Sequence, residues 1–82
     1  MTRDIVVIPE AEAEIAEAVA WFEHSARRGD AFLHTLDATL SAIARDPNQH
    51  PVAFAGVRAA MLPGFPYAVM YVPFMDEIVV VA

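Results

Sequence analysis

The C-terminal third of the chain constrains the fold most, because it consists of strand-like segments that are apolar on both sides. These segments are residues 56–62, 65–72 and 78–82, and turn signals at 63–64 and 73–77 separate them. Successive side chains of a strand point to opposite faces of a sheet. Both sets of alternating positions in the middle segment, FPYAVMYV, are largely apolar, and the last segment, IVVVA, is apolar throughout. The pattern predicts an antiparallel meander with two apolar faces.

The N-terminal half changes to a helical period. The β-branched run 4–8 predicts a first strand, and Pro9 suits the first turn of a helix that follows it. Residues 10–26 and 30–46 then predict two helices in a tight hairpin, with Asp30 as the N-cap of the second.

Each predicted helix carries one apolar stripe. The first stripe comprises Ala11, Ile15, Ala18, Val19, Phe22 and Ala26. The second comprises Phe32, Leu33, Leu36, Leu40 and Ile43. Glu10, Glu14 and Glu17 are expected on the opposite, solvated side of the first helix.

The order β-α-α-β-β-β predicts a single α+β domain over residues 1–82, with the helical hairpin packed on one face of an antiparallel sheet. One layer of helices covers one sheet face, and a face that meets water is normally polar. Because the second face here is apolar, we expect a partner polypeptide to cover it, or a second copy of the chain in a homodimer.

Composition excludes several classes of protein. The chain is 57% hydrophobic, with five arginines, no lysine and a net charge of −6, so direct nucleic-acid binding through a basic face is not expected. It has no cysteine, and its three histidines lack metal-ligand spacing, which predicts no metal and no cofactor. No signal-peptide h-region and no apolar run of about 20 residues is visible, so we expect a soluble, cytoplasmic protein.

Five side chains are candidates for contact with a partner or target, and none is a candidate catalytic residue. They are Trp21, Arg58, Tyr67, Met70 and Tyr71. Trp21 lies at the flank of the first stripe, where tryptophan often anchors an interface, although packing on the loop or second helix also explains it. Arg58 is equally explained as a surface arginine paired with an acidic neighbour, and the two tyrosines as ordinary core or cross-strand packing.

Four stretches, in this order, resemble the RelE/ParE superfamily of toxins from bacterial type II toxin–antitoxin modules, and are closer to its ParE branch. The stretches are IPEAEAEIAEAVAWFE, GDAFLHTLDATLSAIARDP, VRAAMLPGFPYAVMYV and DEIVVVA. The resemblance implies a helical hairpin on an antiparallel sheet. It also implies a cognate antitoxin as partner and, for the ParE branch, inhibition of DNA gyrase.

The resemblance leaves two alternatives open. RelE-like toxins cut mRNA on the ribosome with basic side chains, which stabilise charge on the phosphate. The arginine that follows the position of Tyr67 in those sequences is replaced by Ala68, and Arg58 is the only basic residue on the preceding strand. A basic tail, expected in both branches, would follow Ala82. We therefore expect binding rather than catalysis, and keep as the second alternative a shortened, non-toxic relative that binds antitoxin or itself.

Overall fold

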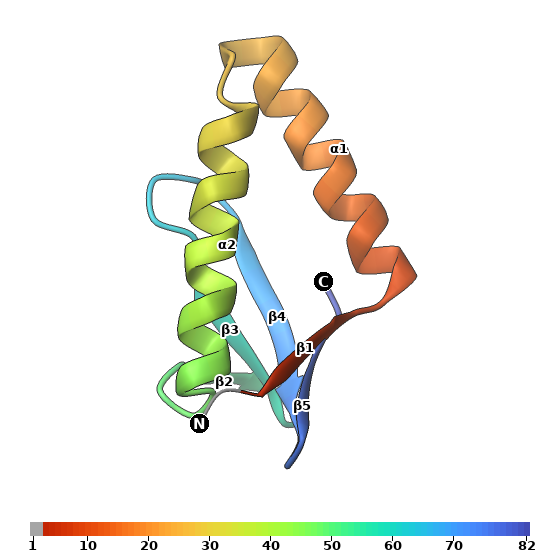
Figure 1. Cartoon of the computed structure of the whole chain (residues 1–82), viewed down its shortest axis with the longest axis vertical. Coiled ribbons are helices and arrows are strands. Elements are labelled where there is room, and N and C mark those ends of the chain that lie inside the picture. Colours follow the sequence, from red (N-terminus) through yellow and green to blue (C-terminus); the bar gives the residue numbers. More distant parts are fainter. Residues whose placement is uncertain (1–2) are drawn as a thin grey trace.

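The structure, a computed structural model, describes residues 3–82 as two helices packed on one face of a five-stranded sheet (Figure 1). The elements are β1 (Asp4–Val7), α1 (Pro9–Ala26), α2 (Gly29–Arg45), β2 (Val52–Phe54), β3 (Val57–Met61), β4 (Ala68–Pro73) and β5 (Glu77–Val80). The α+β class and the helical hairpin on one sheet face are confirmed.

The sheet is mixed, because β1 runs parallel to β5. The strand order is β1-β5-β4-β3-β2, and every neighbouring pair except β1 and β5 is antiparallel. Val7 lies opposite Val80, so the first and last strands of the chain lie side by side. The predicted antiparallel meander therefore describes the C-terminal strands, whereas β1 joins them from the other end of the sequence. Parallel neighbours need a long connection, and here almost the whole chain separates the two strands.

A short strand, β2, was not predicted. Its hairpin with β3 turns at Ala55 and Gly56, whose φ angles are 41° and 79°. Two residues with positive φ form the type of turn that matches the twist of a tight hairpin. Gly56 was predicted to begin the following strand, but it lies in this turn.

The hairpin between the helices differs in detail from the prediction. Pro9 begins α1 as expected, but the cap of α2 is Arg28 and not Asp30. The left-handed residue that ends α1 is Arg27, with φ 54°, rather than a glycine. Gly29 instead allows the start of α2 to lie close to Glu23 of α1. Its N–H donates to Glu23 Oε1 at 3.2 Å, and a Cβ there would lie 3.0 Å from Glu23 Cβ.

The core fills the space between the hairpin and one face of the sheet. Its buried side chains are Ala11, Ala18, Phe22, Phe32, Leu36, Ile43, Ala60, Leu62, Phe65, Val69, Tyr71, Ile78 and Val80. Ile15, Val19 and Leu40 of the predicted stripes are partly buried against this core, whereas two stripe residues are exposed: Ala26, and Leu33 with 42% of its surface in solvent. Both lie toward the hairpin tip, at the end of α1 and in the first turns of α2 (Figure 1).

Tyr71 ties the end of α2 to the middle of the sheet. Its hydroxyl donates to the carbonyl of Pro47 at 2.6 Å, and the whole residue is buried. Beside it, Arg58 Nη1 donates to the carbonyl oxygens of Asn48 and His50. These bonds satisfy carbonyl groups of the loop that carries the chain from α2 to β2.

We expect Tyr71→Phe to lower the free energy of unfolding by about 1–2 kcal/mol, because the buried Pro47 carbonyl loses its donor. Urea denaturation of the two proteins measures the difference. Tyr67→Phe is the matched control, because this tyrosine is 41% exposed and should change stability by less than about 0.5 kcal/mol. Equal effects of the two substitutions would contradict the role given to the Tyr71 hydroxyl.

The same two variants should also differ in how their stability depends on pH. Burial raises the pKa of the Tyr71 phenol above its usual value of 10.0; Arg58 lowers it and Asp46 raises it further. The unfolded chain therefore releases this proton at lower pH than the folded protein does. Stability from this group is complete below pH 10.0 and falls as pH rises through the folded pKa. This loss should disappear in Tyr71→Phe and persist in Tyr67→Phe.

Candidate protein-binding site

The face of the sheet that the helices leave uncovered is apolar, as the strand pattern predicted. The pairing register places its outward side chains in one layer. Its apolar members include Val6, Ala59, Met61, Ala68, Met70, Val72 and Val79, and the exposed carboxylates of Asp4 and Glu77 lie on the same side where β1 and β5 begin. Met61 is 68% exposed and Val6 is 41% exposed. We call this surface the outer face; within residues 3–82 no helix packs on it (Figure 1).

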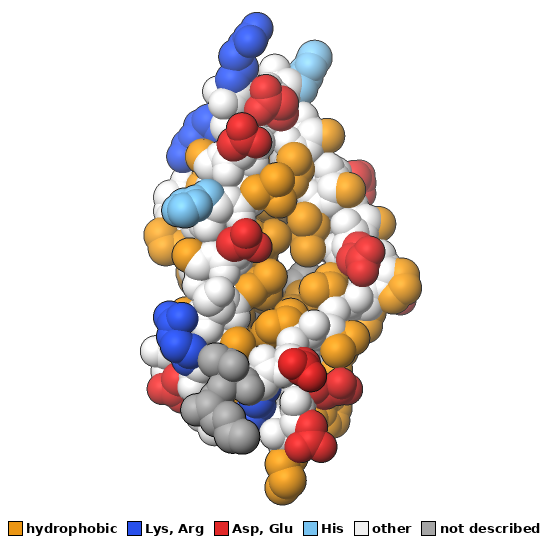
Figure 2. Space-filling model, viewed as in Figure 1, with side chains coloured by type: hydrophobic (Ala, Val, Ile, Leu, Met, Phe, Trp, Pro, Cys, Tyr) orange, Lys and Arg blue, Asp and Glu red, His pale blue; other side chains and the backbone are white. Residues whose placement is uncertain are grey.

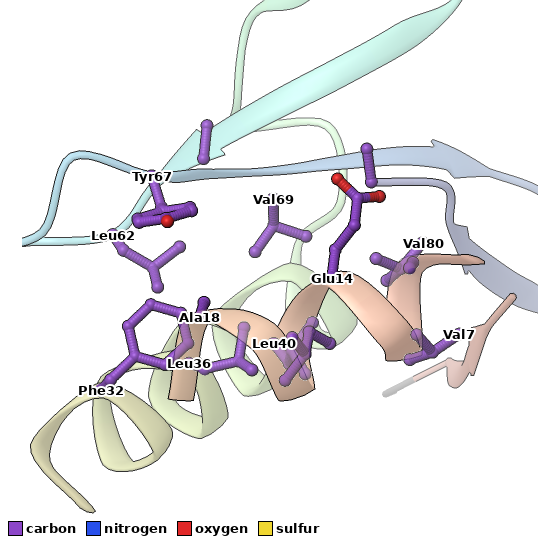
Figure 3. A pocket seen from close by; sticks show the side chains of 14 residues that line it. Val7, Glu14, Ala18, Phe32, Leu36, Leu40, Leu62, Tyr67, Val69 and Val80 are labelled. Carbon is purple, nitrogen blue, oxygen red and sulfur yellow. The ribbon is translucent and has the colours of Figure 1, made fainter. Parts of the chain in front are cut away.

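A second apolar surface lies inside the fold, between α1, α2 and the sheet. It is a cavity of about 130 Å³, seen as a hollow between the helices in Figure 2 and from close by in Figure 3. Its lining residues are Val7, Ala11, Glu14, Ile15, Ala18, Phe32, Leu36, Leu40, Leu62, Tyr67, Ala68, Val69, Val80 and Ala82. We call it the α1 groove.

The groove exists because the two helices present side chains of different size to the sheet. The α1 residues buried on this side include Ala11 and Ala18, which fill little space, whereas α2 presents Phe32 and Leu36. Figure 1 shows α1 diverging from α2 as the two helices leave their connecting turn. Small side chains on a diverging helix leave the space below it unfilled.

Glu14 is the one charged side chain among the described residues that line the groove. Figure 3 shows it pointing from α1 toward the sheet, between Val69 and Val80. Glu14 is exposed, as predicted for the solvated side of the helix, and it also lies at the mouth of the groove. Glu14 follows Ala11 by three positions and precedes Ala18 by four, a spacing that places all three on one helix face.

The groove ends in a cluster of aromatic rings. Trp21 and Tyr67 line a depression together with Glu14, Glu17 and Ala18. Trp21 remains 60% exposed, although its ring packs edge-on against Phe22 at 5.1 Å between centroids. An exposed tryptophan and tyrosine beside carboxylates form a surface of the kind that anchors protein partners.

The structure thus divides the five predicted contact residues among three places. Trp21 and Tyr67 come together at the groove end, and Met70 lies on the outer face. Arg58 and Tyr71 lie under the loop after α2, where their polar atoms bond to backbone carbonyl oxygens. Sequence reasoning missed Glu14 as a groove residue, although its spacing from the two stripe alanines was the available signal.

Two sets of polar side chains in the described residues bear on chemistry, the possible metal ligands and a cluster around His50. In the described residues, no three His, Cys, Asp or Glu side chains are placed to hold a metal ion. His50 Nε2 is buried without a hydrogen-bond partner, and its ring meets Tyr71 edge-on at 6.2 Å, in the same cluster as Arg58. Arg58 hydrogen-bonds to carbonyl oxygens of the loop and Tyr71 is buried, so we infer that this cluster stabilises the loop. No helix in the described part of the chain has the length and apolarity to span a membrane.

Comparison with known proteins shows what the fold is like. No family model and no curated protein matches the sequence. Among solved structures, a chain of the chromosomal ParDE TA system from P. aeruginosa superposes with a TM-score of 0.82 at 14% sequence identity, over 98% of this chain and 91% of that chain. The fold is ParE-like. The sequence resemblance to the RelE/ParE superfamily is therefore confirmed at the level of the fold.

The exposure of Trp21 gives a direct prediction. As the sole tryptophan and 60% exposed, it should show an emission maximum near that of tryptophan in water and strong quenching by acrylamide. Binding of a partner at the groove end should shift the emission to shorter wavelength and protect it from the quencher. Full protection in the isolated monomer would contradict the placement of this ring.

Proposed function

We propose that the protein is the toxin of a type II toxin–antitoxin module of the ParE kind, present in the cytoplasm and neutralised there by a cognate antitoxin. The observation that carries the proposal is the ParE-like fold, which joins the first and last strands of the chain in one sheet. The ordered sequence resemblance over nearly the whole chain points the same way.

The surface of the molecule favours a protein partner. The outer face and the α1 groove together leave two apolar areas uncovered in one small domain. Contiguous exposed apolar surface of this kind usually marks a binding site. The net charge of −6 and the row of glutamates on α1 favour a partner segment with basic side chains.

For the cellular target we propose DNA gyrase, bound by docking and without chemistry. RelE-type mRNA cleavage has less support. Arg58 and Tyr71 are the two polar side chains of the sheet that most resemble a catalytic pair, and both hydrogen-bond to carbonyl oxygens of the loop after α2. Arg58 is the one basic side chain on the strands that the structure describes, and with it bonded to the loop a nuclease mechanism on the sheet would lack its largest contribution.

Co-expression tests the module. Induction of this chain alone in a bacterial host should arrest growth, and co-expression of the small protein encoded by the adjacent gene should restore growth and copurify with it. Size exclusion with light scattering then gives the mass of the complex. Copurification without toxicity would support the shortened, non-toxic relative, and a homodimer that ignores the neighbouring product would contradict the antitoxin proposal.

Target assays separate gyrase from the ribosome. We expect the purified protein to inhibit supercoiling by DNA gyrase and to leave mRNA on programmed ribosomes intact. The same assays with antitoxin added are the control, because an effect of the toxin should disappear in the complex. Codon-specific mRNA cuts, with supercoiling unaffected, would replace this target with the ribosome.

A further inference from the structure

The helical hairpin carries apolar side chains on its outer side, which the fold leaves uncovered. They are Ile15, Ala16, Val19, Ala20 and Leu33, which line a shallow groove between α1 and α2. Ala16, Ala20 and Leu33 are exposed, and Ile15 and Val19 are only partly buried. Figure 2 shows hydrophobic side chains gathered between the two helices on this side. We call this surface the hairpin seam.

The hairpin seam is separate from the α1 groove. Ala18 is buried and lines the α1 groove, whereas Ala16 and Ala20, two positions before and after it, are exposed and line the seam. Two positions along an α-helix correspond to a rotation of about 200°, so these two alanines point away from the sheet. Only Val7 and Ile15 line both surfaces. A ligand in the seam would therefore rest on the hairpin from outside.

Leu33 makes this surface more apolar than a solvated hairpin needs. By spacing it belongs to the apolar stripe of α2, yet 42% of it is exposed, while Phe32 and Leu36 of the same stripe are buried. A single exposed leucine is common on protein surfaces. Leu33, however, shares one groove with Ile15 and Val19 of α1, and contiguous apolar surface of this kind usually marks a binding site.

A glutamate lies toward each end of the hairpin seam. Glu12 and Glu23 both line it, and both are exposed. They are eleven positions apart in the sequence, which is close to three helical turns, so they lie on one side of α1 and about 16 Å apart along its axis. Glu23 Oε1 accepts from the Gly29 N–H, which leaves Oε2 for a ligand. A ligand with a cation toward each end and aliphatic groups between them matches this pattern.

The walls of the seam favour a helix as the ligand. Both walls are helices, whose backbone groups bond within the helix, so the seam offers side chains and no strand edge. Helices pack by inserting ridges of side chains into grooves, and small residues allow axes to approach to about 8 Å. Ala16 and Ala20, one turn apart, provide such a contact on α1. An amphipathic helix laid into an apolar groove is a common mode of recognition between proteins.

Charge argues against a second copy of this chain as the ligand. A two-fold contact brings the same surface of both copies together. Glu12 and Glu23 of one copy would then face carboxylates of the other, between two chains that each carry a net charge of −6. Like charges brought together in this way oppose association.

We propose that the hairpin seam binds an amphipathic helix of a partner protein, which lies along α1 and makes a layer of three helices with the hairpin. The aliphatic stripe of this helix packs on Ala16, Ala20 and Leu33. An Arg or Lys toward each of its ends pairs with Glu12 and Glu23. The inference goes beyond the proposed function and does not depend on it, because it follows from the surface of the hairpin alone.

A synthetic helix tests the seam directly. The probe has 18 residues, the length of α1, with leucines at helical spacing on one face, Arg at positions 4 and 15, Gln and Ala elsewhere, and a hydrocarbon staple that keeps it helical. Its arginines are placed symmetrically, so the probe suits either direction along the seam. It is titrated to about 1 mM while the amide signals of the full chain are followed by NMR. We expect saturable shifts at Ala16, Ala20 and Leu33; shifts confined to the outer face, or none, would overturn the proposal.

A second peptide tests the spacing of the cations. It has the same composition, leucine stripe and staple, but its arginines are at positions 4 and 8, so only one of them can reach a glutamate of the seam. We expect it to bind about threefold more weakly than the first peptide, because one surface ion pair is lost. Equal affinity of the two peptides would contradict the pairing of cations with both ends of the seam.

Two exposed alanines of α1 form a matched pair for the apolar contact. Ala16→Gln places a longer side chain in the seam and should weaken binding of the first peptide at least about fivefold, because the helices can no longer approach closely. Ala13→Gln is the control, because Ala13 is exposed on the same helix but does not line the seam. Both substitutions keep a good helix former, so circular dichroism of the two variants should match the parent. Equal loss of binding in both variants would overturn the placement of the ligand.

Charge reversal tests the acidic ends of the seam. Glu12→Arg should weaken binding of the first peptide about fivefold, and a peptide with Glu in place of one Arg should recover part of this loss. Glu17→Arg is the control, because it changes the net charge equally at an exposed residue of α1 outside the seam. If the two variants weaken binding equally, the attraction comes from the whole acidic surface and this part of the proposal is wrong.

The oligomeric state gives the remaining test. If the signals of Ala16 and Leu33 change when the protein is concentrated without peptide, and light scattering shows a doubled mass, the occupant is a second copy and the proposal is wrong. A monomer whose seam signals respond only to the peptide supports it. Neither result bears on growth arrest or on the neighbouring gene product, so the toxin proposal and this inference can fail independently.

Discussion

A five-stranded sheet covered by a single layer of two helices is the constraint on which the other features of this molecule depend. The hairpin buries one face, and its aromatic and aliphatic side chains provide most of the core. No further helix remains in the described chain to cover the other face, although its side chains are apolar. A domain this small also buries a limited fraction of its surface. Contact with another polypeptide is the natural way to remove such a face from water.

The two helices contribute unequally to this arrangement. α2 lies close to the sheet and is joined to it through the Tyr71 hydroxyl and the Arg58 guanidinium at its C-terminal end. α1 is attached chiefly to α2 and presents alanines to the space below it. The result is a closed side and an open side of the same core. The open side contains the apolar lining of the α1 groove and, at its mouth, the carboxylate of Glu14.

Much of the fold could be predicted from the sequence because its local signals agree with one another. The change from a helical period to alternation placed the hairpin before the meander, and Pro9 marked the start of α1 correctly. β2 was missed because its three residues are too few to show alternation. Its turn also places Ala55 at positive φ, and alanine is not a residue from which such a turn is predicted. Of the candidate contact residues, Trp21 and Tyr67 come together at the groove end, and Arg58 and Tyr71 come together under the loop after α2. Glu10, Glu14 and Glu17 were predicted on one solvated side; Glu14 is exposed, but its place at the groove became visible only from the tertiary structure.

The sequence by itself determined the α+β class, the order of the elements and the excess of apolar strand surface, since these follow from residue type and spacing along the chain. Only the tertiary structure decided that β1 pairs in parallel with β5 and that α1 stands away from the sheet and leaves a groove below it. The physical reason is that strand partners and cavities depend on contacts between residues far apart in the chain. Local periodicity reports which side of an element is apolar, but not which surface will meet it.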